Sequence, residues 1–182
     1  TSVYLPGADL AVFRPSTGTW YIYRSSDNEI QIVQFGLGSD IVAPGDYDGD
    51  AKTDLAVFRP SNGLWYIWRS SDQGYSIFPF GTEGDTPVQA DFDGDGRHDA
   101  AIFRPSTGTW WVNGSSRGVF AAQFGMSADV PATADYDGDG ESDFAVYRNG
   151  VWYILRSSDW ETRIVTFGIE EDIPIGAAYI AE

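Results

Sequence analysis

The chain has 182 residues, enough to bury a hydrophobic core, and it carries a formal net charge of −16 without any cysteine. The missing thiols exclude disulfides, zinc–thiolate sites and cysteine nucleophiles. The acidic balance argues against nucleic acid or an anionic membrane as a partner, because both attract basic surfaces. No apolar run approaches the roughly 20 residues that a membrane-spanning helix requires.

The predicted elements begin with an apolar segment that ends in arginine and recurs four times, at residues 9–14, 54–59, 99–104 and 143–148. After a turn, each is followed by a second run of the Trp-Tyr-Ile type, at residues 20–22, 65–67, 110–112 and 152–154. A Phe-Gly pair comes later in each copy, starting at Phe35, Phe80, Phe124 and Phe167. These runs are rich in aromatic and β-branched residues and show no 3.6-residue apolar period, so we expect them to be strands.

The repeats divide a single domain into units of approximately residues 1–39, 40–84, 85–128 and 129–171, followed by residues 172–182. The second run of each unit is apolar at consecutive positions, which is typical of strands covered on both faces, as in the stacked sheets of a propeller. The last segment is a fifth copy of the strand that precedes each acidic loop, and the first unit lacks that strand. The sequence therefore predicts an all-β, four-bladed β-propeller of about 45-residue repeats, with the ring closed by the C-terminal strand pairing into the N-terminal blade. A larger ring made by two chains is the alternative.

The turn between the first two runs predicts the register of their pairing. In the fourth unit this turn is Asn149-Gly150, a strong signal for a two-residue hairpin, and it places Tyr147 opposite Trp152. The same register pairs Phe13 with Trp20 and Phe58 with Trp65. Extended outward, it places Asp9 opposite Arg24, Asp54 opposite Arg69, and Asp143 opposite Arg156.

Three acidic loops begin at Asp46, Asp91 and Asp135 and have Asp at positions 1, 3, 5 and 9. Four carboxylates within nine residues repel one another unless a cation lies among them, and alternating Asp is how a short loop directs oxygens toward Ca²⁺. A solvated acidic turn is the alternative, but three copies at regular spacing argue against it. The sequence therefore predicts three Ca²⁺ sites. The expected ligands are the side chains of Asp46, Asp48, Asp50, Asp54, Asp91, Asp93, Asp95, Asp99, Asp135, Asp137, Asp139 and Asp143, with the backbone carbonyls of Lys52, Arg97 and Glu141.

The sixth loop position is Gly96 in the second loop and Gly140 in the third, but Ala51 in the first. A left-handed turn is expected there, and positive φ at a residue with a Cβ costs roughly 1 kcal/mol. The first site is therefore expected to be the weakest or to turn differently.

The remaining candidates for chemistry favour structural roles. His98 is the only histidine, and no nucleophile elbow or repeated partner accompanies it, so we expect no enzyme activity. The recurrent Trp20, Trp65, Trp110 and Trp152 are expected to pack between blades rather than to stack on sugars, whereas Trp68, Trp111 and Trp160, which break the repeat, are better ligand candidates. The recurrent Arg14, Arg59, Arg104 and Arg148 are expected to pair with nearby carboxylates, or else to bind an anion along the channel or rim.

The Phe-Gly pair, the Ala-Pro or Ile-Pro segment after it and the Asp-rich loop resemble the FG-GAP (VCBS-type) repeats of integrin-α-like β-propellers, across essentially the whole chain. The resemblance implies a Ca²⁺ loop between the first two strands of a blade and a role as an extracellular recognition or adhesion module, in some cases a lectin. Four units are fewer than is usual in that family, so a ligand site between blades does not carry over.

Weak Ca²⁺ sites fill at extracellular calcium concentrations, so we expect a secreted or cell-surface protein. Its expected function is that of a calcium-stabilised binding module for carbohydrate or a protein surface, monomeric unless two chains complete a larger ring. The alternative is a purely structural spacer within a larger surface protein. A polysaccharide hydrolase or lyase is a weaker alternative, because the Glu residues fall at no repeated position.

Overall fold

The computed structural model describes residues 8–176. All the regular secondary-structure elements in this range are β-strands. No helix there has the length and apolarity needed to cross a membrane. The strands are β1 (Leu10–Arg14), β2 (Thr19–Tyr23), β3 (Ile30–Gln34), β4 (Ile41–Val42), β5 (Leu55–Arg59), β6 (Leu64–Trp68), β7 (Tyr75–Pro79), β8 (Thr86–Ala90), β9 (Asp99–Arg104), β10 (Thr109–Gly114), β11 (Gly118–Gln123), β12 (Val130–Pro131), β13 (Phe144–Arg148), β14 (Val151–Leu155) and β15 (Thr162–Thr166).

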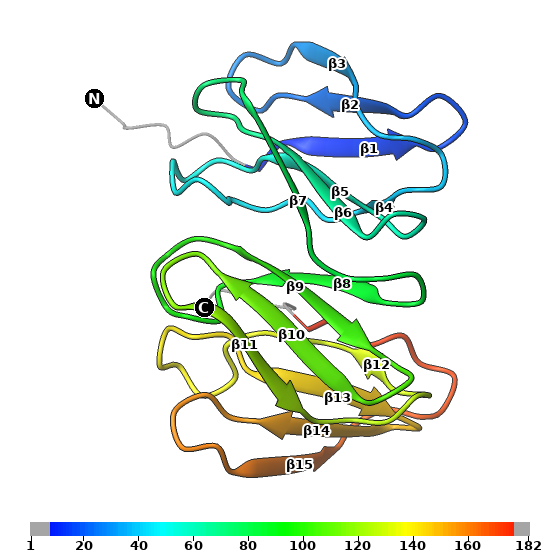
Figure 1. Cartoon of the computed structure of the whole chain (residues 1–182), viewed down its shortest axis with the longest axis vertical. Helices are drawn as coiled ribbons and strands as arrows, with labels where there is room; N and C mark the ends of the chain where they lie inside the picture. Colours follow the sequence, from blue (N-terminus) through cyan, green and yellow to red (C-terminus); the bar gives the residue numbers. More distant parts are fainter. Residues whose placement is uncertain (1–7, 177–182) are drawn as a thin grey trace.

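The strands form four antiparallel sheets that follow one another in chain order: β1–β3, β4–β7, β8–β11 and β12–β15. The first sheet has three strands and each of the others has four. Figure 1 shows the first sheet at one end of the long axis, the fourth at the opposite end and the other two between them. This all-β arrangement of small sheets stacked face to face is consistent with the blades of a β-propeller.

Apolar side chains join each sheet to the next. Trp20 of the first sheet packs with Leu55 and Val57 of the second. In the same way Trp65 packs with Ala100 and Ile102 of the third sheet, and Trp110 packs with Phe144 and Val146 of the fourth. Each inner sheet therefore buries both faces, which explains the consecutive apolar residues of its strands. The predicted inter-sheet role is confirmed for Trp20, Trp65 and Trp110, all buried, while Trp152 on the fourth sheet is half-buried.

The hairpin register is confirmed in the first, second and fourth sheets. Tyr147 lies opposite Trp152, Phe13 opposite Trp20 and Phe58 opposite Trp65. The register also agrees with the expected positions of Asp9, Asp54 and Asp143 opposite Arg24, Arg69 and Arg156, because the residues next to them pair across the strands. No ion pair joins these opposite residues in the described part of the chain. Each of these arginines instead binds an acidic residue of its own hairpin turn, namely Asp27, Asp72 or Asp159, because the tight turn offers a carboxylate three residues away.

The recurrent Phe-Gly pair holds the outer strand of each sheet. The indole nitrogen of Trp20 donates a hydrogen bond to the carbonyl of Phe35, and Trp65, Trp110 and Trp152 do the same with Phe80, Phe124 and Phe167. The turn glycine Gly18 is left-handed (φ 60°), and a Cβ there would collide with the carbonyl oxygen of Gly36. Gly63, Gly108 and Gly150 are equivalent, so the turn and the Phe-Gly pair form one tightly packed unit.

Three of the four recurrent arginines form ion pairs within their sheets, as expected from the structural interpretation. Arg59 binds Asp40, Arg104 binds Asp85 and Arg148 binds Asp129, each through two nitrogens and two carboxylate oxygens. The three aspartates are buried and lie directly before β4, β8 and β12. Each pair thus ties the first strand of a sheet to the end of the second.

The predicted closure of the ring is not confirmed. Residues 172–176 form no strand, and the rest of the predicted closing segment, residues 177–182, lies outside the described residues. In the described part of the chain β1 has β2 as its only strand partner and is largely exposed. The described residues therefore form an open series of four sheets.

Candidate metal centre

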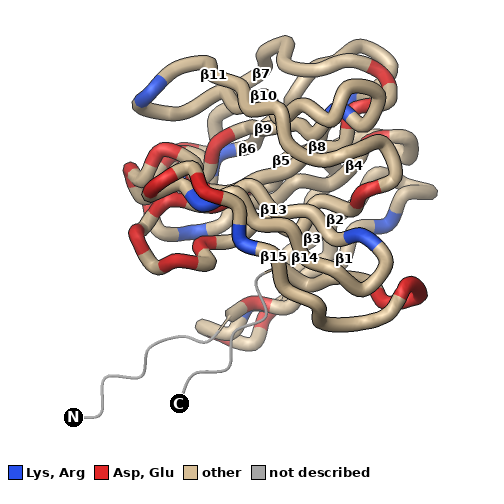
Figure 2. The backbone as a smooth tube through the Cα atoms, turned by 90° about the horizontal axis from the view of Figure 1, so that it is seen from below, with Lys and Arg blue, Asp and Glu red and all other residues tan. Residues whose placement is uncertain are grey.

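Each acidic loop joins the first strand of a sheet to the second: β4 to β5, β8 to β9 and β12 to β13. Figure 2 shows the largest group of acidic positions on one side of the molecule. The second loop follows β8 directly and ends at Asp99, the first residue of β9, whereas the first and third loops begin four residues after the last residue of β4 and of β12. Strand pairing brings both ends of each loop together. Isolated bridges between Gly45 and Asp54 and between Ala134 and Asp143 close two of the loops.

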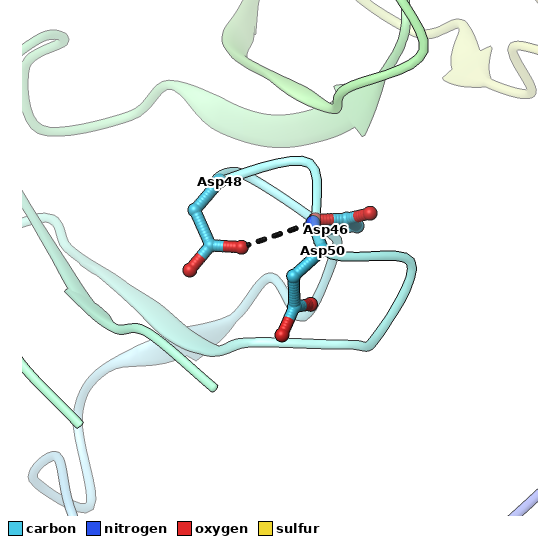
Figure 3. A group of neighbouring side chains, drawn as sticks. All are labelled: Asp46, Asp48 and Asp50. Atoms are coloured by element: carbon cyan, nitrogen blue, oxygen red, sulfur yellow. Dashed lines mark hydrogen bonds between the residues drawn. The ribbon is translucent and has the colours of Figure 1, made fainter. Parts of the chain in front are cut away.

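Within each loop three carboxylates converge, with one oxygen from each lying within 4.8 Å of the others. The groups are Asp46, Asp48 and Asp50; Asp91, Asp93 and Asp99; and Asp135, Asp137 and Asp143. Figure 3 shows the first group, in which the amide of Asp50 donates a hydrogen bond to Oδ1 of Asp48. The predicted ligands therefore meet in threes, and the fourth aspartate of each loop, namely Asp54, Asp95 or Asp139, lies outside its group.

Asp93 supplies the strongest sign that these groups suit a cation. Its Oδ2 accepts hydrogen bonds from the amides of Ser116 and Arg117, but its buried Oδ1 has no hydrogen-bond partner among the described residues. A buried carboxylate oxygen without a partner is costly unless a cation binds it. The donor set is all oxygen, which is the chemistry that Ca²⁺ prefers.

The ninth-position aspartates are buried at the junction of loop and strand. Both oxygens of Asp99 accept backbone hydrogen bonds, from Phe92 within the loop and from Ser115 in the following hairpin. Asp54 and Asp143 have equivalent partners. These three carboxylates therefore brace the loop against the hairpin, in addition to the role as metal ligands predicted for them.

Burial raises the pKa of Asp99 to about 6, and the neighbouring negative charges of Asp93 and Asp91 add to the effect against the opposing amide hydrogen bonds. Burial likewise raises the pKa of Asp54 and of Asp143. Clustered buried carboxylates favour either a proton or a metal ion. The groups therefore have the electrostatics of a cation site.

The fifth loop position differs between the loops. Asp95 forms an ion pair of 2.7 Å with Arg97 and lies outside the group of three in the second loop, whereas Lys52 is 3.8 Å from Asp50 in the first. The closer guanidinium of Arg97 lowers the pKa of Asp95. Coordination by Asp95, and by the carbonyls of Lys52, Arg97 and Glu141, stays a prediction.

Ala51 adopts the same left-handed turn as the glycines at its position. Its φ is 63°, compared with 85° for Gly96 and 95° for Gly140. The first loop therefore keeps the common shape and carries the cost of positive φ at a residue with a Cβ. The weaker affinity expected for this site stays a prediction.

Neighbouring loops are linked by backbone hydrogen bonds. The amide of His98 donates to the carbonyl of Asp46, and the amide of Ser142 donates to that of Asp91. The His98 ring lies between loops, where its Nδ1 accepts a bond from the amide of Asp46. His98 is thus half-buried and makes a structural contact.

A pair of serines in each hairpin turn was missed as part of the site. Ser70 and Ser71 donate hydroxyl hydrogen bonds to Asp50 and Asp48, and Ser157 and Ser158 do so to Asp139 and Asp137. Ser115 binds Asp95 in the same way. The recurrence of Ser-Ser after the second strand, at residues 25, 70, 115 and 157, is the sequence signal that identifies them.

The aromatic residues that break the repeat are only partly available to a ligand. Trp111 is 38% and Trp160 is 50% exposed, whereas Trp68 is half-buried, stacks on Tyr75 and donates its indole hydrogen bond to Gln73. A cleft of about 830 Å³ lies beside Trp68, between the first and second sheets. Its described lining includes Asp9, Arg24, Gln31, Trp68 and Ser70.

Comparisons with known proteins bear on the fold and on the family of the chain. A search of curated protein sequences found no match. Among solved structures, the chain is similar to one described as the crystal structure of BBS1N in complex with ARL6DN, soaked with lead, with a TM-score of 0.52 and 13% sequence identity. The alignment covers 87% of this chain and 52% of that one, so this chain spans about half the length of its structural relative. The profile of the FG-GAP-like repeat matches residues 46–102 and 91–146, which include all three acidic loops, and the chain therefore belongs to the FG-GAP-like repeat family.

Proposed function

We propose that this chain is a calcium-stabilised, non-catalytic binding module that acts outside the cell or on its surface. The observation that carries the proposal is the recurrence of three converging carboxylate groups, one of which holds a buried oxygen without a hydrogen-bond partner among the described residues. Weak Ca²⁺ sites fill at extracellular calcium concentrations, which supports a location outside the cell.

The bound ions would stabilise the sheets from their loop ends. The loop carboxylates contact both the loop amides and the hairpin serines, as Asp50 does with Lys52 and Ser70. A cation among them offsets their mutual repulsion and so removes the cost of holding them together. Calcium therefore stabilises the junction between the first three strands of a sheet.

Calorimetric titration and thermal unfolding test this step. We expect three Ca²⁺ per chain, and fewer in Asp93→Asn, which keeps the shape of the side chain but removes its charge. A site held at 100 times its Kd adds about 2.7 kcal/mol to stability. At roughly 2–4 °C per kcal/mol for a chain of this size, EDTA should lower the Tm by several degrees. An unchanged Tm and no heat of binding would overturn the calcium proposal.

We propose carbohydrate as the ligand class and the cleft between the first two sheets as its site. The cleft combines the indole of Trp68 with polar groups of Arg24, Gln31 and Ser70, a combination that suits a sugar's apolar face and hydroxyls. A glycan array, read with Ca²⁺ and with EDTA, tests the class. Trp68→Ala should abolish binding, and Trp111→Ala, which changes an indole outside the cleft, should not.

A non-catalytic role is supported by the cleft's composition. Asp9 is the only carboxylate among its described lining residues, and glycosidic hydrolysis ordinarily needs two. The Asp9 side chain also accepts hydrogen bonds from the amide and hydroxyl of Ser25. An array without any glycan signal would favour a protein ligand or a structural spacer, the second candidate, which the stacked sheets and acidic surface also suit.

A further inference from the structure

The outward face of the first sheet is apolar, and no other part of residues 8–176 forms a sheet over it. Leu10 is 71% and Val12 is 62% exposed on β1, although the repeat places them where the other sheets have buried residues. The buried equivalents are Leu55 and Val57 on β5, Ala100 and Ile102 on β9, and Phe144 and Val146 on β13, all 8% exposed or less. In those sheets the preceding sheet covers the face, and the described residues contain no sheet before β1.

On the fourth sheet, the face that in the other sheets contacts the next sheet has no sheet over it in the described part of the chain. Phe167 is 75% exposed, whereas its equivalents Phe35, Phe80 and Phe124 are half-buried against the next sheet. A shallow pocket of about 240 Å³ lies here, lined by Tyr136, Trp152, Ile154, Arg163, Val165 and Phe167. On the third sheet the same face is filled by the next sheet, where Phe144 packs on Trp110 with ring centroids 5.4 Å apart.

The two uncovered faces are therefore the two halves of a contact that the molecule already makes three times. The face with Leu10 and Val12 corresponds to the side that receives a tryptophan, and the face with Trp152 corresponds to the side that supplies one. The two faces therefore match in shape and polarity, because their equivalents in the other sheets already pack against one another.

A separated ion pair points to the same contact. Arg14 is the equivalent of Arg59, Arg104 and Arg148. It is nevertheless exposed and pairs with no carboxylate among residues 8–176, and its guanidinium contacts Tyr21. Asp172 is the equivalent of Asp40, Asp85 and Asp129 and is likewise exposed, without an arginine partner in the described part of the chain. In the other sheets this pair joins the first strand to the second, so a sheet built on β1 with residues 172–176 as its first strand would unite Arg14 and Asp172.

We propose that two copies of this chain associate head to tail, with residues 172–176 of one copy pairing as the missing strand along β1 of the other. Arg14 of one copy then binds Asp172 of the other, and Leu10 and Val12 cover the Trp152 and Phe167 face. Figure 1 places the first and fourth sheets at opposite ends of the long axis, so within one copy these surfaces are apart. Two such contacts close a symmetric ring of two copies, and the otherwise unpaired edge of β1 is covered.

Charge reversal tests the proposal with the full chain in Ca²⁺-containing buffer. We expect the parent to sediment at twice the chain mass of 20.0 kDa. Arg14→Glu and Asp172→Arg should each be monomeric, with the dissociation constant raised by roughly 30-fold or more, because each places like charges at both contacts. Arg24→Glu is the matched control: it makes the same charge change on the same sheet, in the turn after β2, where Arg24 pairs with Asp27 and Glu29, and it should stay dimeric.

Mixing the two monomeric variants gives the decisive result. In a mixed dimer one contact joins the two substituted side chains, which again carry opposite charges, and the other contact joins the unchanged Arg14 and Asp172. An equimolar mixture of R14E and D172R should therefore return to the dimer mass. Circular dichroism of each variant confirms that it is folded.

Three outcomes would overturn the proposal. The first is a parent that stays monomeric at its highest soluble concentration. The second is a dimer that neither variant weakens. The third is a monomeric parent destabilised by each variant and restored only when both changes are in one chain, which would show the closing strand pairing within its own copy.

Discussion

The ion pair between Arg104 and Asp85 offers the clearest quantitative test of the packing. The Asp85 side chain is 1% exposed and its two oxygens lie 2.8 Å from Nε and Nη2 of Arg104. Arg104→Met keeps a long apolar side chain and leaves this buried carboxylate without its cation. Removing one partner of a buried pair costs about 3–5 kcal/mol. We expect about 3 kcal/mol, at the low end of the range, because the Arg104 side chain keeps 28% of its surface exposed.

Urea unfolding at pH 7 with saturating Ca²⁺ measures the effect, and Arg69→Met is the matched control. Arg69 binds Asp72, whose side chain is 58% exposed, so losing this pair should cost less than about 1 kcal/mol. Adding Asp85→Asn to Arg104→Met should recover part of the loss, because it removes the buried charge and keeps an acceptor for the Thr82 amide. Equal losses for Arg104→Met and Arg69→Met would refute the argument that burial makes this pair important.

Three further predictions follow from the loops and the core. Ala51→Gly should raise the Ca²⁺ affinity of the first site roughly fivefold, as expected for about 1 kcal/mol of relieved backbone strain, and calorimetry showing no gain would contradict this. The metal-free protein should become more stable to urea as the pH falls from 7 toward 4. The reason is that the pKa of Asp99 is about 6 in the fold and 3.8 without its environment, so the folded state binds the proton more tightly. Saturating Ca²⁺ should reverse the trend, since protons then compete with the metal. Trp110→Ala should cost about 3–5 kcal/mol and the same change at half-buried Trp152 clearly less, which comparative urea unfolding checks; equal losses would contradict the packing described.

Local chemistry explains why much of the fold follows from the sequence. The Asn149-Gly150 turn fixes a two-residue hairpin, and the pairing of Tyr147 with Trp152 then carries over to the other repeats. Trp20, Trp65 and Trp110 are buried because each of these sheets needs an apolar side chain to meet the next. These features depend on neighbours a few residues away or one repeat away, which a single sequence displays.

Other features depend on choices among partners at similar distances. Strand register places Arg69 opposite Asp54, and Asp72 follows Arg69 by three residues in the hairpin turn. The turn geometry favours the ion pair with Asp72. The serines at positions 70 and 71 look like ordinary turn residues until the structure brings them against Asp50 and Asp48. Whether the sheets close into a ring depends on the sum of small rotations between sheets, and no residue in the sequence encodes that sum by itself.

The hydrogen bond from each tryptophan to its Phe-Gly partner has a consequence for how such chains change over evolutionary time. Every sheet holds its outer strand with its own indole and its own glycine turn, so this fastening never crosses from one repeat to the next. Contacts between sheets combine apolar packing with backbone hydrogen bonds between neighbouring loops, and equivalent residues make them at successive steps. A gene duplication or deletion of a whole repeat therefore replaces each contact between sheets by an equivalent one, so the number of repeats can drift while the structure of each one is kept.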